Sequence, residues 1–187
     1  MKSILIDHDD SFTYNLRHWL KPLSSEVTIV NHRELSSAPD LRADFFILSP
    51  GPKKPEDYTD VLHFLGRLSS KTPVFGVCLG LQLMVHSHGG KVQPYSPPLH
   101  GKKSKLKVLS EELHLLQGKE VARYHSLYCT DYPAEEFETL AVAEEDQCPM
   151  WLRHRQKKWL GVQFHPESFL TEKPELHLQI VKDWLNA

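Results

Sequence analysis

The sequence predicts an α/β fold with a central, mostly parallel sheet. Short apolar runs alternate with segments whose apolar residues recur at helical spacing through residues 2–88. The chain has 187 residues and is 40% hydrophobic, which is enough to bury one full core. It contains no internal repeat, low-complexity tract or linker, so residues 1–187 are expected to form a single domain.

The first half of the chain alternates between predicted strands and predicted helices. Asp7 ends the opening apolar run, and Phe12, Leu16 and Trp19 then recur at helical spacing. The same reasoning places strands at 2–6, 26–30, 44–48 and 73–77, and helices at 12–20, 58–69 and 79–88. Strands that alternate with helices imply right-handed crossovers and a parallel, largely buried sheet.

The second half changes character after residue 90. It contains short strand-like segments without long helices, at 106–109, 120–124, 139–143, 150–155 and 159–164. This part of the sheet is therefore expected to be mixed and partly antiparallel. A final amphipathic helix at 174–185 directs Leu176, Ile180, Val181 and Trp184 toward the core.

Charge and hydropathy argue against several classes of partner. The 22 basic and 24 acidic residues give a net charge of -2 and form no basic block, which argues against a nucleic-acid partner. The longest apolar stretch, Val74 to Val85, is interrupted and is shorter than the ~20 residues of a membrane helix. The N-terminus reaches Asp7 too early for a signal peptide. We therefore expect no membrane partner and a cytoplasmic location.

The cysteines and histidines do not follow the spacing of a metal site. Cys78, Cys129 and Cys148 are an odd number without a C-x-x-C pair, which argues against disulfides and structural zinc. We expect Cys129 and Cys148 to be structural. The 12 histidines include no H-E-x-x-H pattern, and His86 and His88 would point to different faces of a helix. No metal and no cofactor are expected.

The segment around Cys78 has the pattern of a nucleophile elbow. An apolar strand passes into a helix through Gly76-Val77-Cys78-Leu79-Gly80. Small flanking residues permit the sharp turn that exposes a nucleophile at the carboxyl end of a sheet. A helix N-terminus would favour the thiolate of Cys78, and the amide of Leu79 would point toward a developing oxyanion. The alternative is that Cys78 is a small buried apolar residue between two packing glycines.

A second strand end supplies a candidate base. The apolar segment Trp159 to Phe164 leads directly into His165-Pro166-Glu167. An imidazole can withdraw and return a proton near neutral pH, and Glu167 can accept its other N–H and fix its tautomer. Both strands would end at the same edge of a parallel sheet, where active sites gather. The alternative is an ordinary polar turn after a strand.

A third loop, Ser49-Pro50-Gly51-Pro52-Lys53, follows the strand at 44–48. Gly51 allows the backbone to approach a ligand closely, so its peptide could complete an oxyanion hole opposite Leu79. The alternative is an ordinary proline-rich turn.

Taken together, these segments closely resemble the class I (triad-type) glutamine amidotransferases, and within them the glutaminase subunits of anthranilate synthase and aminodeoxychorismate synthase. The resemblance covers nearly the whole chain. It rests on Asp10-Ser11-Phe12-Thr13-Tyr14-Asn15-Leu16, Ser49-Pro50-Gly51-Pro52, Gly76-Val77-Cys78-Leu79-Gly80, Arg123-Tyr124-His125-Ser126-Leu127 and Gln163-Phe164-His165-Pro166-Glu167-Ser168. It implies a three-layer fold with a central, mostly parallel sheet and a smaller antiparallel sheet.

The resemblance also implies a reaction and a set of site residues. Cys78 would attack the side-chain amide of L-glutamine, with His165 as base and then acid and Glu167 as its orienting carboxylate. The substrate site would be formed by Gly51, Pro52, Lys53, Leu79, Gln82, Ser126 and Leu127. The ammonia released would pass to a chorismate-binding synthase subunit of the tryptophan pathway, the folate pathway or both.

The sequence departs from the family pattern in three places. The family usually has glycine where Lys53 stands, so a positive φ there would cost ~1 kcal/mol or the loop would differ. It commonly has histidine in place of Leu81, beside the nucleophile, and asparagine-tyrosine in place of His8-Asp9.

Two other functions remain open from the sequence. One is a different triad hydrolase of the same fold, a peptidase or a γ-glutamyl hydrolase, which the product would distinguish. The other is a non-catalytic scaffold subunit with a decayed site, which Lys53 favours and the intact Cys78, His165 and Glu167 oppose.

Overall fold

The computed structural model describes residues 1–37 and 41–187. Within these ranges a nine-stranded sheet has the order β2-β1-β3-β4-β11-β10-β9-β6-β7, and β5 and β8 pair in a small second sheet. The strands are β1 (Lys2–Asp7), β2 (Glu26–Asn31), β3 (Phe45–Leu48), β4 (Val74–Val77), β5 (Lys91–Pro94), β6 (Lys102–Val108), β7 (Glu120–Arg123), β8 (Leu127–Asp131), β9 (Phe137–Ala143), β10 (Pro149–His154) and β11 (Trp159–Val162). The predicted α/β class, with a large sheet and a smaller antiparallel one, is confirmed.

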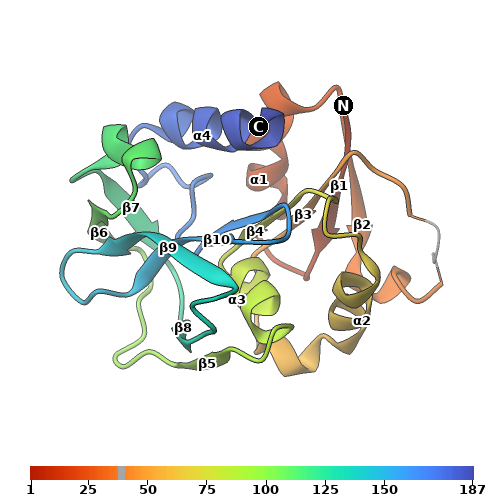
Figure 1. Cartoon of the computed structure of the whole chain (residues 1–187), viewed down its shortest axis with the longest axis horizontal. Coiled ribbons are helices and arrows are strands. Elements are labelled where there is room, and N and C mark those ends of the chain that lie inside the picture. Colours follow the sequence, from red (N-terminus) through yellow and green to blue (C-terminus); the bar gives the residue numbers. More distant parts are fainter. Residues whose placement is uncertain (38–40) are drawn as a thin grey trace.

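Four α-helices flank the large sheet in the described part of the chain. They are α1 (Thr13–Leu20), α2 (Thr59–Arg67), α3 (Leu79–His86) and α4 (Pro174–Asn186). Short 3-10 helices cover Lys21–Leu23, His32–Glu34, Pro55–Asp57 and Glu111–Leu116. Figure 1 shows α1 and α4 on one face of the sheet and α2 and α3 on the other, so the molecule has three layers.

The sheet has a parallel half and a half with reversed strands. β2, β1, β3, β4 and β11 are parallel neighbours. From β11 onward the neighbours β10, β9, β6 and β7 pair antiparallel, so β10 and β6 run against the other seven strands of the described sheet. In the parallel half, α1 lies between β1 and β2 and α2 lies between β3 and β4, as the alternating pattern predicts, whereas short turns join the antiparallel neighbours β9, β10 and β11.

Successive residues of the central strands face different helix layers. Leu5, Ile47 and Phe75 pack in one core cluster together with residues of α1 and α4 such as Leu16 and Val181. Their strand neighbours pack in a second cluster with α2 and α3, and its members include Ile4, Ile6, Phe46, Leu48, Val61, Phe64, Leu65, Leu79 and Leu83. Since side chains alternate across a strand, strands that are apolar on both faces become buried between two helix layers.

The structure differs from the sequence-based assignment in the second half. The strands β5 and β8 were not predicted, because Lys91–Pro94 is polar and ends in proline and Leu127–Asp131 has no clear alternation. Strand β6 begins at Lys102, before the predicted segment, since its lysines line the exposed face while Ser104 and Leu106 point inward. Helix α3 ends at His86 and β11 ends at Val162, two residues earlier than expected in both cases.

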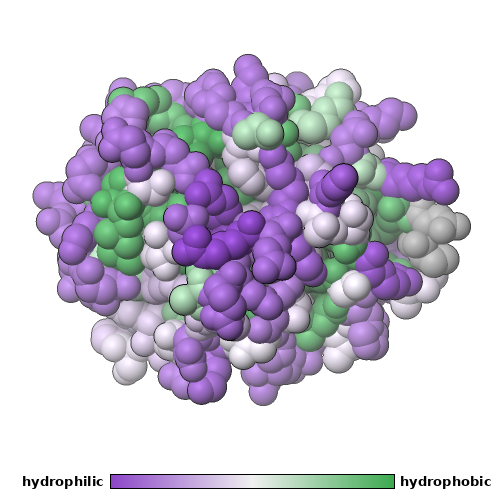
Figure 2. Space-filling view, in the orientation of Figure 1, coloured by the Kyte–Doolittle hydropathy of each residue, from purple (hydrophilic) through white to green (hydrophobic). Residues whose placement is uncertain are grey.

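The surface mixes polar and apolar side chains. On the face shown in Figure 2, apolar residues form separate patches between polar ones. No helix in the described ranges combines the length and the apolar character needed to cross a bilayer.

The sheet places the ends of β4 and β11 side by side. These two strands are parallel neighbours in register, with Val77 opposite Val162. The N–H of Cys78 donates to the carbonyl of Val162 at 2.7 Å. The residues that follow each strand, Cys78 and Gln163, therefore leave the sheet at the same edge, and His165 lies two residues further on.

Candidate active site

Cys78 lies in a strained turn between β4 and α3. Its backbone has φ 52° and ψ -103°, a conformation that few non-glycine residues adopt. The two flanking glycines allow the turn because side chains there would collide with backbone. A Cβ on Gly80 would lie 2.4 Å from the Leu48 carbonyl oxygen, and one on Gly76 would lie 2.6 Å from the carbonyl carbon of Gly80. The Gly-x-Cys-x-Gly spacing is thus a steric requirement of this elbow.

Cys78, His165 and Glu167 come together at this edge of the sheet. Glu167 Oε1 lies 2.7 Å from His165 Nδ1, and both side chains are buried. Burial lowers the pKa of His165, but the charge of Glu167 and the hydrogen bond with Cys78 outweigh it, so the pKa is raised well above its usual value. The arrangement favours an imidazolium between the sulfur and the carboxylate. Such a group can return a proton to a leaving amine.

The turn that carries His165 is tied to neighbouring strands. The N–H of His165 donates to the carbonyl of Ala122 in β7 at 3.0 Å, and the hydroxyl of Thr171 donates to the carbonyl of His165 at 2.6 Å. The N–H of Ala122 in turn donates to Thr171 Oγ1 at 3.0 Å. These bonds fix the imidazole against the edge of the sheet.

Two aromatic rings pack against His165. The ring centroids of Phe12 and Tyr124 lie 5.0 and 5.1 Å from that of the imidazole, and 5.1 Å from each other. The Tyr124 hydroxyl also lies 3.2 Å from Ser168 Oγ. Phe12 comes from the β1–α1 loop and Tyr124 from the end of β7, so the site brings together loops far apart in the sequence. Their packing against the base was not predicted, although both residues lie in the quoted motifs.

The loop after β3 lies against the residue that follows the nucleophile. A Cβ on Gly51 would lie 2.6 Å from Leu79 Cδ2 and from His8 Cβ, so only glycine fits at this approach. The structure therefore brings Gly51 and Leu79 together. Tyr58 donates its hydroxyl to the carbonyl of Pro52 at 2.7 Å, and Lys53 has a positive φ of 69°. A lysine therefore adopts the left-handed backbone conformation that glycine favours.

The amide side chain of Gln82 links Leu127 to Cys78 through Gln163. Its Nε2 donates to the carbonyl of Leu127 at 2.9 Å and to Gln163 Oε1 at 3.1 Å. Gln163 Nε2 donates to Cys78 Sγ at 3.5 Å. Ser126 precedes Leu127 on the same segment and is exposed. Sequence reasoning did not select Gln163, although its place two residues before His165 at the end of β11 could have pointed to it.

A buried arginine supports the segment that leads to Ser126. Arg123 donates to Asp146 Oδ2 at 2.6 Å, to Ser104 Oγ at 3.0 Å and to His125 Nε2 at 3.0 Å. Burial, followed by the charge of Arg123, lowers the pKa of His125 to about 3. A neutral His125 can therefore accept from the guanidinium. This network fixes the backbone before Leu127 without taking part in chemistry itself.

Of the remaining departures from the family pattern, two are buried in the core and one makes a surface ion pair. His8 is buried with its Nδ1 3.0 Å from the Ser49 carbonyl, and burial followed by the charge of His32 lowers its pKa to about 3. Asp9 adopts φ 61° and pairs with Arg33. Leu81 is fully buried in the cluster that joins α3 to β8, β9 and β10.

The other two cysteines have the environment of inert thiols. Burial raises the pKa of Cys129 well above its ordinary value and the pKa of Cys148 to about 12. Both side chains lie in the core, as expected for structural cysteines.

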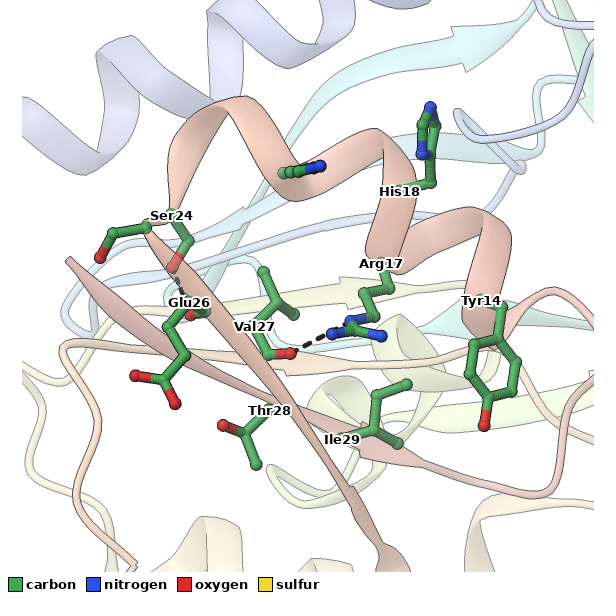
Figure 3. A pocket seen from close by; sticks show the side chains of 10 residues that line it. Tyr14, Arg17, His18, Ser24, Glu26, Val27, Thr28 and Ile29 are labelled. Carbon is green, nitrogen blue, oxygen red and sulfur yellow. Dashed lines mark hydrogen bonds between the residues drawn. The ribbon is translucent and has the colours of Figure 1, made fainter.

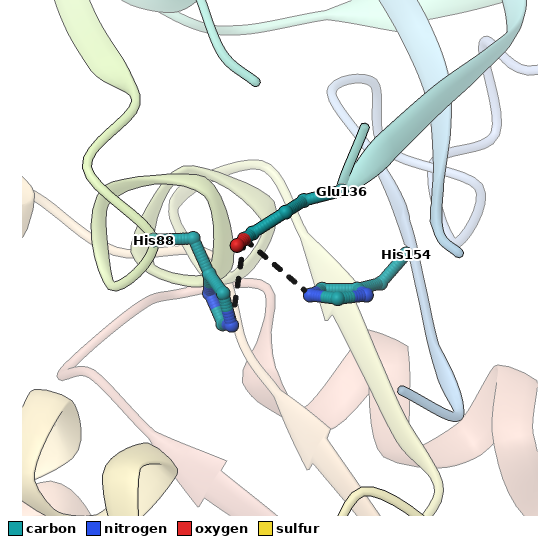
Figure 4. A group of neighbouring side chains, drawn as sticks. All are labelled: His88, Glu136 and His154. Atoms are coloured by element: carbon teal, nitrogen blue, oxygen red, sulfur yellow. Dashed lines mark ion pairs between the residues drawn. The ribbon is translucent and has the colours of Figure 1, made fainter. Parts of the chain in front are cut away.

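A histidine pair and a glutamate approach one another away from Cys78 (Figure 4). His88 Nε2 and His154 Nε2 lie 3.9 and 3.8 Å from Glu136 Oε2. His154 Nδ1 accepts from the N–H groups of Gln156 and Lys157, which places its proton on Nε2. A metal needs a lone pair on each ligand atom, so this tautomer does not fit a metal ion. No motif spacing could have predicted the group, since its members come from three separate segments.

A cavity of about 780 Å³ lies elsewhere, between α1 and the edge strand β2 (Figure 3). Tyr14, Arg17 and Lys21 line it from α1 and the turn that follows, and Arg17 Nε donates to the Val27 carbonyl at 3.2 Å. It is lined by none of the residues around Cys78 that the structure describes. Its size alone does not make it a reaction site.

Comparison with known proteins agrees with the resemblance of the motifs. The model of the family "Glutamine amidotransferase class-I" matches residues 4–182. "Anthranilate synthase component 2" of Halobacterium salinarum is 36% identical over 184 residues, covering 91% of each chain. "Aminodeoxychorismate synthase" of Streptomyces griseus is 40% identical over 179 residues, which cover 92% of this chain.

Some relatives are much longer. The chain spans 24% of the Streptomyces griseus protein and 23% of an "Anthranilate synthase" of Azospirillum brasilense. Among solved structures, a Thermoplasma acidophilum protein described as part of a GMP synthase has a TM-score of 0.82 at 21% identity and covers 100% of this chain and 94% of its own. At that identity the likeness concerns the fold.

Proposed function

The chain belongs to the class I glutamine amidotransferase family, and we propose that it hydrolyses L-glutamine through Cys78 and delivers the ammonia to a separate chorismate-aminating synthase subunit. The observation that carries this proposal is the close grouping of Cys78, His165 and Glu167, with a raised pKa at the imidazole. The names of the relatives, anthranilate synthase component 2 and aminodeoxychorismate synthase, support the choice of partner.

In the proposed mechanism the Cys78 thiolate attacks the side-chain amide carbon of glutamine. The carbonyl oxygen becomes an oxyanion, which the N–H groups of Leu79 and Gly51 stabilise as two preorganised donors. His165 gives its proton to the nitrogen, the C–N bond breaks, and ammonia leaves a glutamyl thioester on the sulfur. Glu167 stabilises the imidazolium until this proton is transferred, and it then continues to orient the neutral ring.

The second half-reaction returns the enzyme to its starting state. His165, now neutral, takes a proton from a water molecule as the water attacks the thioester carbon. The C–S bond breaks, glutamate is released, and the thiolate and imidazolium form again. In this scheme Gln82, Ser126 and Leu127 hold the amino-acid end of the substrate, together with the loop that contains Pro52 and Lys53. Residues 1–187 act as one domain.

In this proposal the synthase partner consumes the ammonia. Free ammonia would be protonated in water, so we propose direct transfer to a synthase that binds chorismate. The product is either an anthranilate or an aminodeoxychorismate, and one glutaminase could serve both.

The test is glutaminase activity of the wild type and of Cys78→Ala, with and without the chorismate-binding subunit from the same source. We expect low activity alone, an increase with the partner, and loss in the variant. Cys129→Ala is the matched control, because its buried thiol is protonated and lies in the core. Unchanged turnover in Cys78→Ala would overturn the nucleophile. Cleavage of γ-glutamyl peptides without ammonia from glutamine would indicate another triad hydrolase.

A further inference from the structure

The side chain of Gln163 connects the nucleophile to the candidate substrate site, and it has no place in the mechanism above. It is fully buried and directly follows β11. We propose that Gln163 is a positioning residue that directs an N–H group at the sulfur of Cys78 and so holds the thiolate in its attacking orientation. This inference rests on the proposed function, because it assigns a role within the same reaction.

The direction of the hydrogen bonds follows from a backbone carbonyl. The Leu127 oxygen can only accept, and it lies 2.9 Å from an amide position of Gln82, which must therefore be the Nε2 donor. The same Nε2 lies 3.1 Å from Gln163, so the atom of Gln163 that faces it must be the acceptor Oε1. The remaining amide group of Gln163, 3.5 Å from Cys78 Sγ, is then the donor Nε2. The Leu127 carbonyl thus fixes both amide orientations along the chain.

The hydrogen bond from Gln163 to Cys78 Sγ is strengthened by the burial of both residues. Gln163 is 0% exposed and Cys78 is 7% exposed, so water offers little competing solvation of a thiolate. A donor aimed at an anion stabilises it more than a donor aimed at a neutral group. His165 approaches the same sulfur as a second donor. With two donors, the sulfur is held from two directions, which restricts the rotamer of a residue whose backbone is already strained.

The chain also determines what Gln82 can offer a ligand. Both N–H groups of its amide are engaged, one by Leu127 and one by Gln163. The group left to contact glutamine is the carbonyl Oε1, which accepts from an ammonium but not from a carboxylate. Gln163 therefore links the orientation of the nucleophile to recognition of the α-amino group of the substrate.

The test uses Gln163→Glu, which keeps the size of the side chain and the acceptor for Gln82 but turns the group facing sulfur from donor into anion. The rate of Cys78 alkylation by iodoacetamide is measured against pH, with Cys78→Ala as the blank. Because the thiolate is the species that reacts, we expect the midpoint of alkylation to move up by about 1 to 3 pH units. Gln156→Glu, the same change at an exposed residue, should leave the profile in place.

Kinetics with glutamine and the synthase partner give a second readout. We expect kcat of Gln163→Glu to fall by at least about 10- to 100-fold, because the thiolate loses a hydrogen bond and faces a carboxylate of the same charge, with a smaller change in KM. If Gln163→Glu does not fold, Gln163→Ala takes its place and should shift the profile in the same direction. A folded variant at position 163 with the wild-type alkylation profile would overturn the role of Gln163.

The two proposals fail in different ways. If the wild type releases no ammonia from glutamine with its partner, the proposed function is wrong, yet the alkylation profiles still measure the bond to sulfur. If the wild type is active and Cys78 is required while Gln163→Glu alkylates normally, the positioning role alone is wrong.

Discussion

Replacing Gly80 by alanine should distort the nucleophile elbow. The added Cβ would lie 2.4 Å from the Leu48 carbonyl oxygen and 2.7 Å from Leu48 Cβ. Normal contacts between such atoms are about 3.5 Å, so the overlap is on the order of 1 Å. Neither atom can swing away, because one is backbone and the other is attached to it. Helix α3 must move from β3, at a cost of about 1 to 3 kcal/mol of unfolding free energy.

A helix glycine elsewhere provides the matched control. Gly66 lies in α2 with nothing within 4 Å of an added Cβ, so Gly66→Ala should stabilise the protein by about 0.4 to 1 kcal/mol. The measurement is denaturant unfolding of both variants, together with the rate of Cys78 alkylation. We expect Gly80→Ala to lose both stability and alkylation rate, and Gly66→Ala to lose neither. If Gly80→Ala unfolds at the wild-type denaturant concentration, the steric account of the Gly-x-Cys-x-Gly spacing is wrong.

Three further outcomes are expected. Glu167→Gln removes the charge that raises the pKa of His165, so the alkaline limb of the pH–rate profile should move to lower pH; an unmoved limb contradicts this. Lys53→Gly removes the strain of a side chain at a φ of 69°, but it also gives the unfolded chain greater conformational freedom. The net gain in the free energy of unfolding should therefore be at most ~1 kcal/mol, and a loss of stability would argue against strain at this position. Burial lowers the pKa of His177 to about 4, so the folded state resists protonation of this side chain while the unfolded state accepts a proton below about pH 6.5. The free energy of unfolding should therefore fall by about 3 kcal/mol as the pH drops from 6.5 toward 4. His177→Phe should therefore raise Tm more at pH 4.5 than at pH 7.5, and equal shifts at the two pH values would refute the assignment.

Much of the fold could be read from local pattern. The four parallel strands and three helices of the first half were each predicted within a few residues, since strands buried on both faces and amphipathic helices have strong periodic signals. The strands β5 and β8 were missed. Lys91–Pro94 and Leu127–Asp131 are short and lack a clear apolar alternation, and they are strands because each pairs with the other. Pairing between distant segments leaves little trace in the composition of either one.

Part of the candidate site could likewise be predicted from local sequence, and part of it could not. The elbow around Cys78 and the turn of His165 and Glu167 have spacings that reflect local steric and hydrogen-bonding needs, so sequence could select them. The roles of Gln163 and Phe12 depend on which residues face them after folding. A glutamine after a strand and a phenylalanine before a helix have many structural explanations, and only their contacts with Cys78 and His165 distinguish these two.

By itself the sequence determined the α/β class, the position of the elbow and the chemical types of the nucleophile and its base, because each depends on neighbours within a few residues. The tertiary structure decided that β4 and β11 are adjacent, that the Leu127 carbonyl orients two buried amides, and that Glu167 and Cys78 together outweigh the effect of burial on the pKa of His165. These are properties of distances between segments up to 85 residues apart, and such distances are set only when the whole chain packs.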